Sequence, residues 1–142
     1  MPQQIESKIQ IIIHGTDDSE KIKNSIENIF NLDYNDFQIQ NLTGHFENPI
    51  IMLTLVIKKK NSEEFVSKLF SKMKKNDLKI ISENLDKQLD NTSLKIRISK
   101  QRLIMGEIVL DDKDAIKISI TIPIYVKKDF AKIYRQTLKI PE

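Results

Sequence analysis

The stretch Leu94-Lys95-Ile96-Arg97-Ile98-Ser99 indicates the fold class of this chain most directly. Its aliphatic side chains alternate with polar or charged ones, which is the pattern of a strand with one buried and one solvated face. Sheets with one solvated face are usually antiparallel. The stretch therefore predicts a strand that packs its apolar side on a core and presents a basic outer face.

Three other segments extend this sheet. Residues 8–14 and 116–124 alternate isoleucine with other residues, and Pro123 predicts that the second of these strands reaches an edge or leaves the sheet at its far end. Residues 50–57 are apolar except for Thr54, as expected of a strand that is covered on both faces or lies at the centre of a sheet. A strand over residues 37–41 should pair with it antiparallel through the turn at 43–49.

Apolar residues at helical spacing predict three helices between these strands. The first should span 18–31, the second should start at Asn61 with Glu64 completing a capping box, and the third should start at Asn76 and end near residues 90–92. Residues 107–110 are expected to form a short hairpin arm.

The order β-α-β-β-α-α-β-(β)-β favours an α+β fold, a mostly antiparallel sheet with helices packed on one face. We expect a single α+β domain over 1–126 and a C-terminal helix or tail over 127–142, in which 130–138 is the helical candidate.

Composition excludes several classes of protein. The 142 residues contain no cysteine and only 3 glycines, which argues against a disulfide framework, a thiolate metal site, a phosphate-binding glycine loop and a dinucleotide fingerprint. The apolar run at 11–13 is too short for a signal peptide or a membrane span. We therefore expect a cytoplasmic protein with no cofactor, no metal and no membrane partner.

Two histidines are the only candidates for catalysis. His14 should end a strand and His45 should lie in a turn, and neither has a second histidine at metal-ligand spacing. A small hydrolase using His14, His45 and Asp17 is the enzymatic alternative. Solvated loop histidines are the more ordinary explanation, so we do not expect an enzyme.

The charge is distributed unevenly along the chain. Residues 1–57 carry a net −5 and residues 58–142 a net +8. Lysines and arginines follow the outer faces and ends of the predicted strands, and they should converge in the fold to meet RNA phosphates. The candidate phosphate ligands are Lys58, Lys59, Lys60, Lys95, Arg97, Lys100, Arg102 and Lys117.

The predicted basic face contains no aromatic residue. A sheet that reads single-stranded RNA by base stacking needs exposed aromatic rings on adjacent strands. RNA binding here should therefore depend on phosphate contacts, with weak sequence specificity. His45 and Gln101 are the candidate local readers.

Several motifs resemble an archaeal family of RNA-binding proteins and predicted exosome subunits. They are GHFENPII at 44–51, the apolar strand that ends in Lys58-Lys59-Lys60, LKIRISKQR at 94–102, and Gly106. The resemblance covers about residues 5–126. It implies a fold like that of the large-subunit ribosomal protein that binds the small ribosomal RNA, and a role in RNA processing or degradation, with an RNA-degrading complex as a partner.

These observations favour a non-catalytic RNA-binding protein. The first alternative is a protein-interaction module in which the sheet edge or the isoleucine-rich surfaces form a homodimer or dock on a larger complex.

Overall fold

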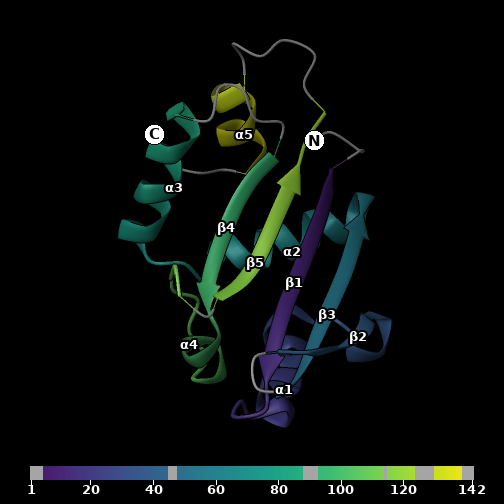
Figure 1. The fold of residues 1–142 in the computed structure, drawn as a ribbon. Helices are drawn as coiled ribbons and strands as arrows, with labels where there is room; N and C mark the ends of the chain where they lie inside the picture. The colour runs from purple at the N-terminus through teal and green to yellow at the C-terminus, as the bar shows by residue number, and fades with distance from the viewer. Residues whose placement is uncertain (1–4, 45–47, 88–92, 114, 124–129, 139–142) are drawn as a thin grey trace.

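The computed structural model describes residues 5–44, 48–87, 93–113, 115–123 and 130–138. They contain one antiparallel sheet with strand order β2-β3-β1-β5-β4 (Figure 1). The predicted α+β class is confirmed. The strands are β1 (Glu6–His14), β2 (Gln38–Thr43), β3 (Pro49–Lys58), β4 (Ser93–Ser99) and β5 (Ala115–Thr121).

The helices leave one side of the sheet uncovered. In Figure 1, α1 and α2 lie behind the sheet, α3 and α5 lie beside β4, and none of the described helices crosses the side that faces the viewer. We call this side the open face. The helical segments are α1 (Ser19–Phe30), the 3₁₀ helix η1 (Tyr34–Asp36), α2 (Lys59–Ser71), α3 (Lys75–Lys87), α4 (Lys100–Ile104) and α5 (Phe130–Leu138).

The core lies between the sheet and the helices, and the alternating isoleucines build it. Ile11 of β1 lies opposite Leu53 of β3, and Ile118 of β5 lies opposite Ile9 and Ile96. All five side chains are buried. Because side chains alternate along a strand, every second residue of these strands points to the open face instead.

Local signals set some helix boundaries but not others. Asp18 caps α1 by accepting a hydrogen bond from the Lys21 N–H (3.1 Å). The predicted start of the second helix at Asn61 is wrong, because α2 follows β3 without a loop and begins at Lys59, whose φ is +56°. The sequence did not lead us to expect α4, which Ser99 caps by accepting from the Arg102 N–H (3.1 Å).

The prediction that residues 50–57 form a central or doubly covered strand is also wrong. The central strand is β1, and β3 is second from the edge. The Val56 side chain lies on the open face and is 47% exposed. The apolar composition of β3 therefore combines a face that packs on the core, with Leu53 and Ile57 buried, and an apolar stretch of the open face.

The outer edge of β4 is occupied by the segment expected as a hairpin arm. The Ser99 N–H donates to the Val109 carbonyl (2.9 Å) and the Asp111 N–H donates to the Arg97 carbonyl (3.0 Å). Pro123 lies beyond the end of β5, which is an interior strand. Of the two predicted options, an edge strand or a chain that leaves the sheet at Pro123, the second is confirmed.

The C-terminal segment contains a helix, α5, that packs on the core through Tyr134. Its phenol donates to the Ile120 carbonyl (3.0 Å) and accepts from the Ile122 N–H (2.9 Å). Burial raises the pKa of Tyr134 to about 12. Arg135 connects α5 to α3 through Ser82, with its Nε 2.8 Å from the hydroxyl.

Candidate nucleic-acid interface

Four cationic side chains gather on the open face over β1, β5 and β4. Lys95 and Arg97 alternate with the buried residues of β4, and Lys117 and Lys8 occupy the equivalent positions of β5 and β1. All four are exposed. Together with Gln10 and Ser119 they line a shallow cavity of about 250 Å³. We call these six residues the basic face.

The strand register places these residues in two rows across the sheet. In one row Arg97 lies opposite Lys117, which lies opposite Gln10. In the next row Lys95 lies opposite Ser119, which lies opposite Lys8. Adjacent strands are about 4.8 Å apart, so the rows form a continuous cationic patch with two neutral hydrogen-bonding groups inside it.

Arg97 and Lys117 face each other at close range. The Asp111 N–H bonds to the Arg97 carbonyl on the outer side of β4, so Arg97 directs its backbone groups away from β5. Arg97 and Lys117 therefore form a non-hydrogen-bonded pair, the type in which side chains approach most closely. Like charges directly opposite each other destabilise a sheet, so this pair adds nothing to folding stability.

The described residues supply no carboxylate partner for these cations. No described Asp or Glu oxygen lies within 4.0 Å of a side-chain nitrogen of Lys8, Lys95, Arg97 or Lys117. Asp111 and Asp112 border the patch, since they line a neighbouring cavity of about 510 Å³ with Lys95 and Arg97 at the β4 edge. The patch thus keeps its positive charge available for a polyanion.

Aromatic side chains within the described ranges lie elsewhere. Phe30 and Phe65 contact each other in the core (ring centroids 5.0 Å apart), and Tyr34 contacts Phe37 near the end of α1. The basic face consists of Lys, Arg, Gln and Ser residues, and the cavity that they line is completed by Ile96 and Ile118. It offers charges and hydrogen bonds to a backbone but no platform for base stacking.

Lys100 does not join this surface, and the expectation that it lies on an accessible basic patch is wrong. Its side chain is only 1% exposed, and its ammonium group donates to the Ile12 carbonyl (2.6 Å) and to Asp17 Oδ2 (2.8 Å). An ammonium group that is buried and paired in this way connects α4 to the end of β1. It acts as part of the core.

The environment of Asp17 matches this structural role. Burial alone would raise the pKa of its carboxyl group, but hydrogen bonds from Lys100 and from the His14 N–H (2.8 Å), with the nearby positive charge, lower the pKa below its ordinary value of 3.8. The carboxylate therefore stays ionised. Asp17 is committed to this ion pair, which weakens the hydrolase alternative built on His14, His45 and Asp17.

The other predicted ligands lie apart from the basic face. Lys58, at the far end of β3, lies 3.9 Å from Glu6 Oε1, and Arg102 on α4 lies 3.6 Å from Glu107 Oε1. Gln101 is exposed on α4, and Lys59 and Lys60 are exposed in the first turn of α2. His45 lies outside the described residues. Of the ten predicted site residues, the fold brings Lys95, Arg97 and Lys117 together.

Sequence reasoning missed Lys8 and Gln10. Both belong to the segment 8–14, from which sequence reasoning took a predicted strand but no candidate ligand. Their positions in the alternation were the available signal. Ile9 and Ile11 point to the core, so Lys8 and Gln10 must point to the other face of β1. Their position beside Lys117 and Ser119 depends on the register of β1 with β5.

Comparisons with known proteins show the family of this chain. A family model described as RNA binding matches residues 6–122. The chain belongs to this RNA-binding family. One relative, the RNA-binding protein PAB1135 of Pyrococcus abyssi, is 29% identical over 133 residues, which cover 89% of this chain and 86% of the relative.

Two solved structures match this fold along nearly the whole chain. Protein SSO0741 of Sulfolobus solfataricus is 26% identical with a TM-score of 0.76, and the match covers 94% of this chain and 97% of that one. Mth689 of Methanothermobacter thermautotrophicus, at 23% identity and a TM-score of 0.71, covers 95% and 98% and supports the fold alone. No described helix of this chain is long and apolar enough to cross a membrane.

Proposed function

We propose that this member of the RNA-binding family is a non-catalytic protein that binds RNA through the basic face of its sheet. The observation that supports this most strongly is the cross-strand pair of Arg97 and Lys117, two like charges that the fold holds opposite each other beside Lys8 and Lys95. A phosphate backbone would offset their repulsion.

The proposed contacts are mainly to phosphates. Lys8, Lys95, Arg97 and Lys117 would supply the charge, while Gln10 and Ser119 can hydrogen-bond to sugar or phosphate oxygens. Such contacts fix position but carry little sequence information. We therefore propose weak sequence specificity, and a cytoplasmic role accessory to RNA processing or degradation, in association with an RNA-degrading complex. We also propose that the fold is like that of the large-subunit ribosomal protein that binds the small ribosomal RNA.

The test measures RNA affinity against salt. Fluorescence anisotropy of a labelled single-stranded RNA should give a log–log slope that becomes shallower by up to about 3 when Lys8, Lys95, Arg97 and Lys117 are all replaced by Gln, because each phosphate contact on a single strand contributes about 0.7. The matched control replaces four exposed lysines, Lys72 at the C-cap of α2, Lys75 and Lys79 on α3, and Lys132 on α5. An equal loss of slope in both variants would remove the basic face as the interface.

A second candidate, a homodimer, is favoured by β2. This edge strand is exposed along its whole length and contains no charged residue, and Ile39 and Leu42 are 55% and 39% exposed. Neutral exposed edges are the ones that pair with another strand. Light scattering should show a dimer that Gln40→Lys dissociates, and a monomer at all concentrations would exclude this candidate.

A further inference from the structure

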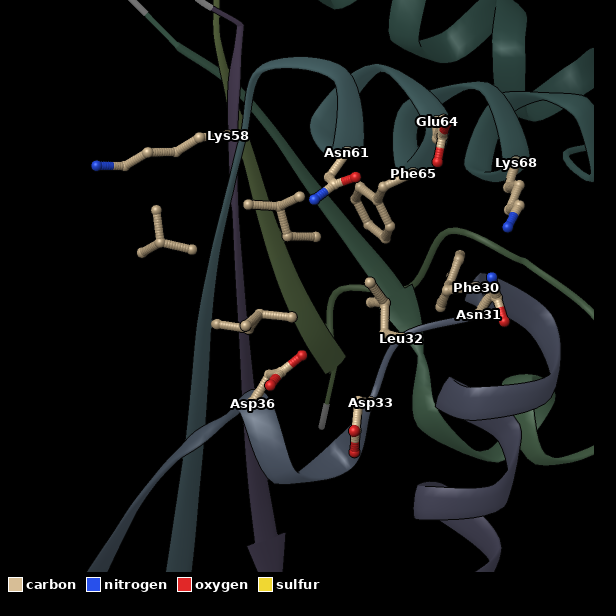
Figure 2. Close-up of a pocket in the computed structure, with 13 residues that line it drawn as sticks. Phe30, Asn31, Leu32, Asp33, Asp36, Lys58, Asn61, Glu64, Phe65 and Lys68 are labelled. Atoms are coloured by element: carbon tan, nitrogen blue, oxygen red, sulfur yellow. The ribbon is translucent and has the colours of Figure 1, made fainter.

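Another cavity, of about 350 Å³, lies on the β2 side of β3, where this strand approaches α2, whereas the basic face begins on β1, on the other side of β3. Its walls come from the end of α1, the segment through η1, the last residues of β3 and the first two turns of α2 (Figure 2). The proposed RNA site does not use any of these residues.

The cavity exists because β2 is shorter than β3. The pairing of the two strands ends where Gln38 lies opposite Thr54, whereas β3 continues to Lys58. The preceding residues form η1, which Asp33 caps by accepting from the Asn35 N–H (2.9 Å). Next to residues 55–58 the described part of the sheet therefore lacks a strand over about 13 Å.

The hydrogen-bonding phase shows which backbone groups face this vacant position. The Lys59 N–H bonds to the Ile5 carbonyl (3.0 Å), so odd-numbered residues at this end of β3 bond to β1. Even-numbered residues of this segment bond on the side of β2. The Asn48 carbonyl, just before β3, accepts a hydrogen bond from the Gly44 N–H just after β2 (2.8 Å). The N–H and C=O of Val56 and the N–H of Lys58 thus point to the vacant position, where no described strand meets them.

The walls combine an apolar floor with carboxylates. Phe30, Leu32 and Phe65 form the floor, and Asp33, Asp36 and Glu64 contribute carboxylates from two sides. Figure 2 shows the Lys58 side chain directed away from the other labelled residues, and its ammonium lies 3.9 Å from Glu6. Lys68 is then the one lining cation near the carboxylates, so the charge here is net negative.

We propose that an extended, basic segment of a partner protein adds to the edge of β3 in this cavity. Its main chain would bond to Val56 and Lys58, as in recognition by strand addition. The aliphatic stem of an arginine or lysine would lie over Leu32 and Phe65, with its charged head near Asp36 and Glu64. The negative walls disfavour RNA, so this surface would recruit a protein while the basic face stays free.

The test uses the full chain, labelled with ¹⁵N, and two acetylated and amidated hexapeptides. One alternates Arg with Val and the other alternates Glu with Val. We expect the Arg peptide alone to bind, to shift the amide signals of Val56 and Lys58, and to slow hydrogen exchange at Val56. Binding of both peptides with equal affinity would overturn the proposal, and so would binding of the Arg peptide that leaves the Val56 amide unchanged.

Matched variants test the carboxylates. The double variant Asp36→Asn/Glu64→Gln should weaken binding of the Arg peptide about five- to tenfold, as expected for two partly exposed charge pairs. The control Glu20→Gln/Glu83→Gln removes the same charge from exposed positions on α1 and α3 and should bind as the unmodified chain does. Equal weakening by both doubles would show nonspecific attraction and would overturn the assignment to this cavity.

Discussion

Lys95 and Arg97 differ from Lys100 in almost every physical respect, although the three lie within six residues of sequence. The two residues on β4 are exposed on the open face without an ion-pair partner among the described residues. Lys100, at the start of α4, is buried and bonded to Asp17 and Ile12. The change from strand to helix at Ser99 separates a binding surface from a core contact.

This difference shows that a cation is informative about function only when its surroundings are known. A paired, buried ammonium group contributes to a specific packing arrangement, whereas an unpaired cation opposite another cation lowers stability and needs an external anion. Four predictions test this distinction.

The largest effect should come from Lys100→Met. The substitution leaves the Asp17 carboxylate buried without its partner, which costs about 3–5 kcal/mol. Lys95→Met, at an exposed position, should change stability by less than about 0.5 kcal/mol. Urea unfolding of both variants measures the contrast, and equal midpoints would mean that Lys100 has no structural role.

Acid should weaken the same ion pair. Because the pKa of Asp17 is lower in the folded chain, its contribution is fully present above the ordinary value of 3.8 and is lost as the pH falls through the lowered value. The stability difference between the unmodified chain and Asp17→Asn should therefore shrink on acidification. The apolar double variant Asp17→Leu/Lys100→Met provides the control, since it lacks both charges and should lose this part of the acid dependence.

A smaller effect should distinguish Arg97 from Arg102 in RNA binding. Arg97→Gln should reduce the salt slope for a single strand by about 0.7, the share of one phosphate contact. Arg102→Gln should reduce it less, because Glu107 already lies 3.6 Å from the Arg102 guanidinium. Anisotropy titrations over a salt series compare the two, and a larger reduction from Arg102 would move the interface toward α4.

The smallest effect should be a gain in stability from Lys117→Gln. Removing one of two opposed like charges should raise the free energy of unfolding by about 0.2–0.5 kcal/mol relative to Lys8→Gln, whose cross-strand neighbours are Val56 and Ser119. The gain should disappear in about 1 M salt, where the Debye length is about 3 Å. A gain that persists there would indicate a cause other than charge.

Alternation in the sequence predicted much of the sheet and part of the candidate site. It placed Lys95, Arg97 and Lys117 on one face because a strand residue's side is set by its position. It could not predict that Lys100 meets a carboxylate 83 positions away, because that contact depends on the docking of α4 against the loop after β1.

The vacant position beside Val56 was also beyond sequence reasoning. Nothing in the composition of residues 50–58 shows that β2 ends at Gln38 while β3 continues. That mismatch follows from η1, a single turn that Asp33 caps. Capping signals identify turns, but they do not give the direction that the chain takes afterwards.

The cations of the basic face stand on three adjacent strands of the sheet, with Lys8 on β1 and Lys117 on β5, each of which pairs with a strand on both sides, and Lys95 and Arg97 on β4. Their backbone lost its conformational freedom when the protein folded, so ligand binding would restrict only the side-chain torsions of four long residues. A surface of this kind is preorganised, and its affinity should respond to ionic strength much more than to any reagent that loosens surface loops.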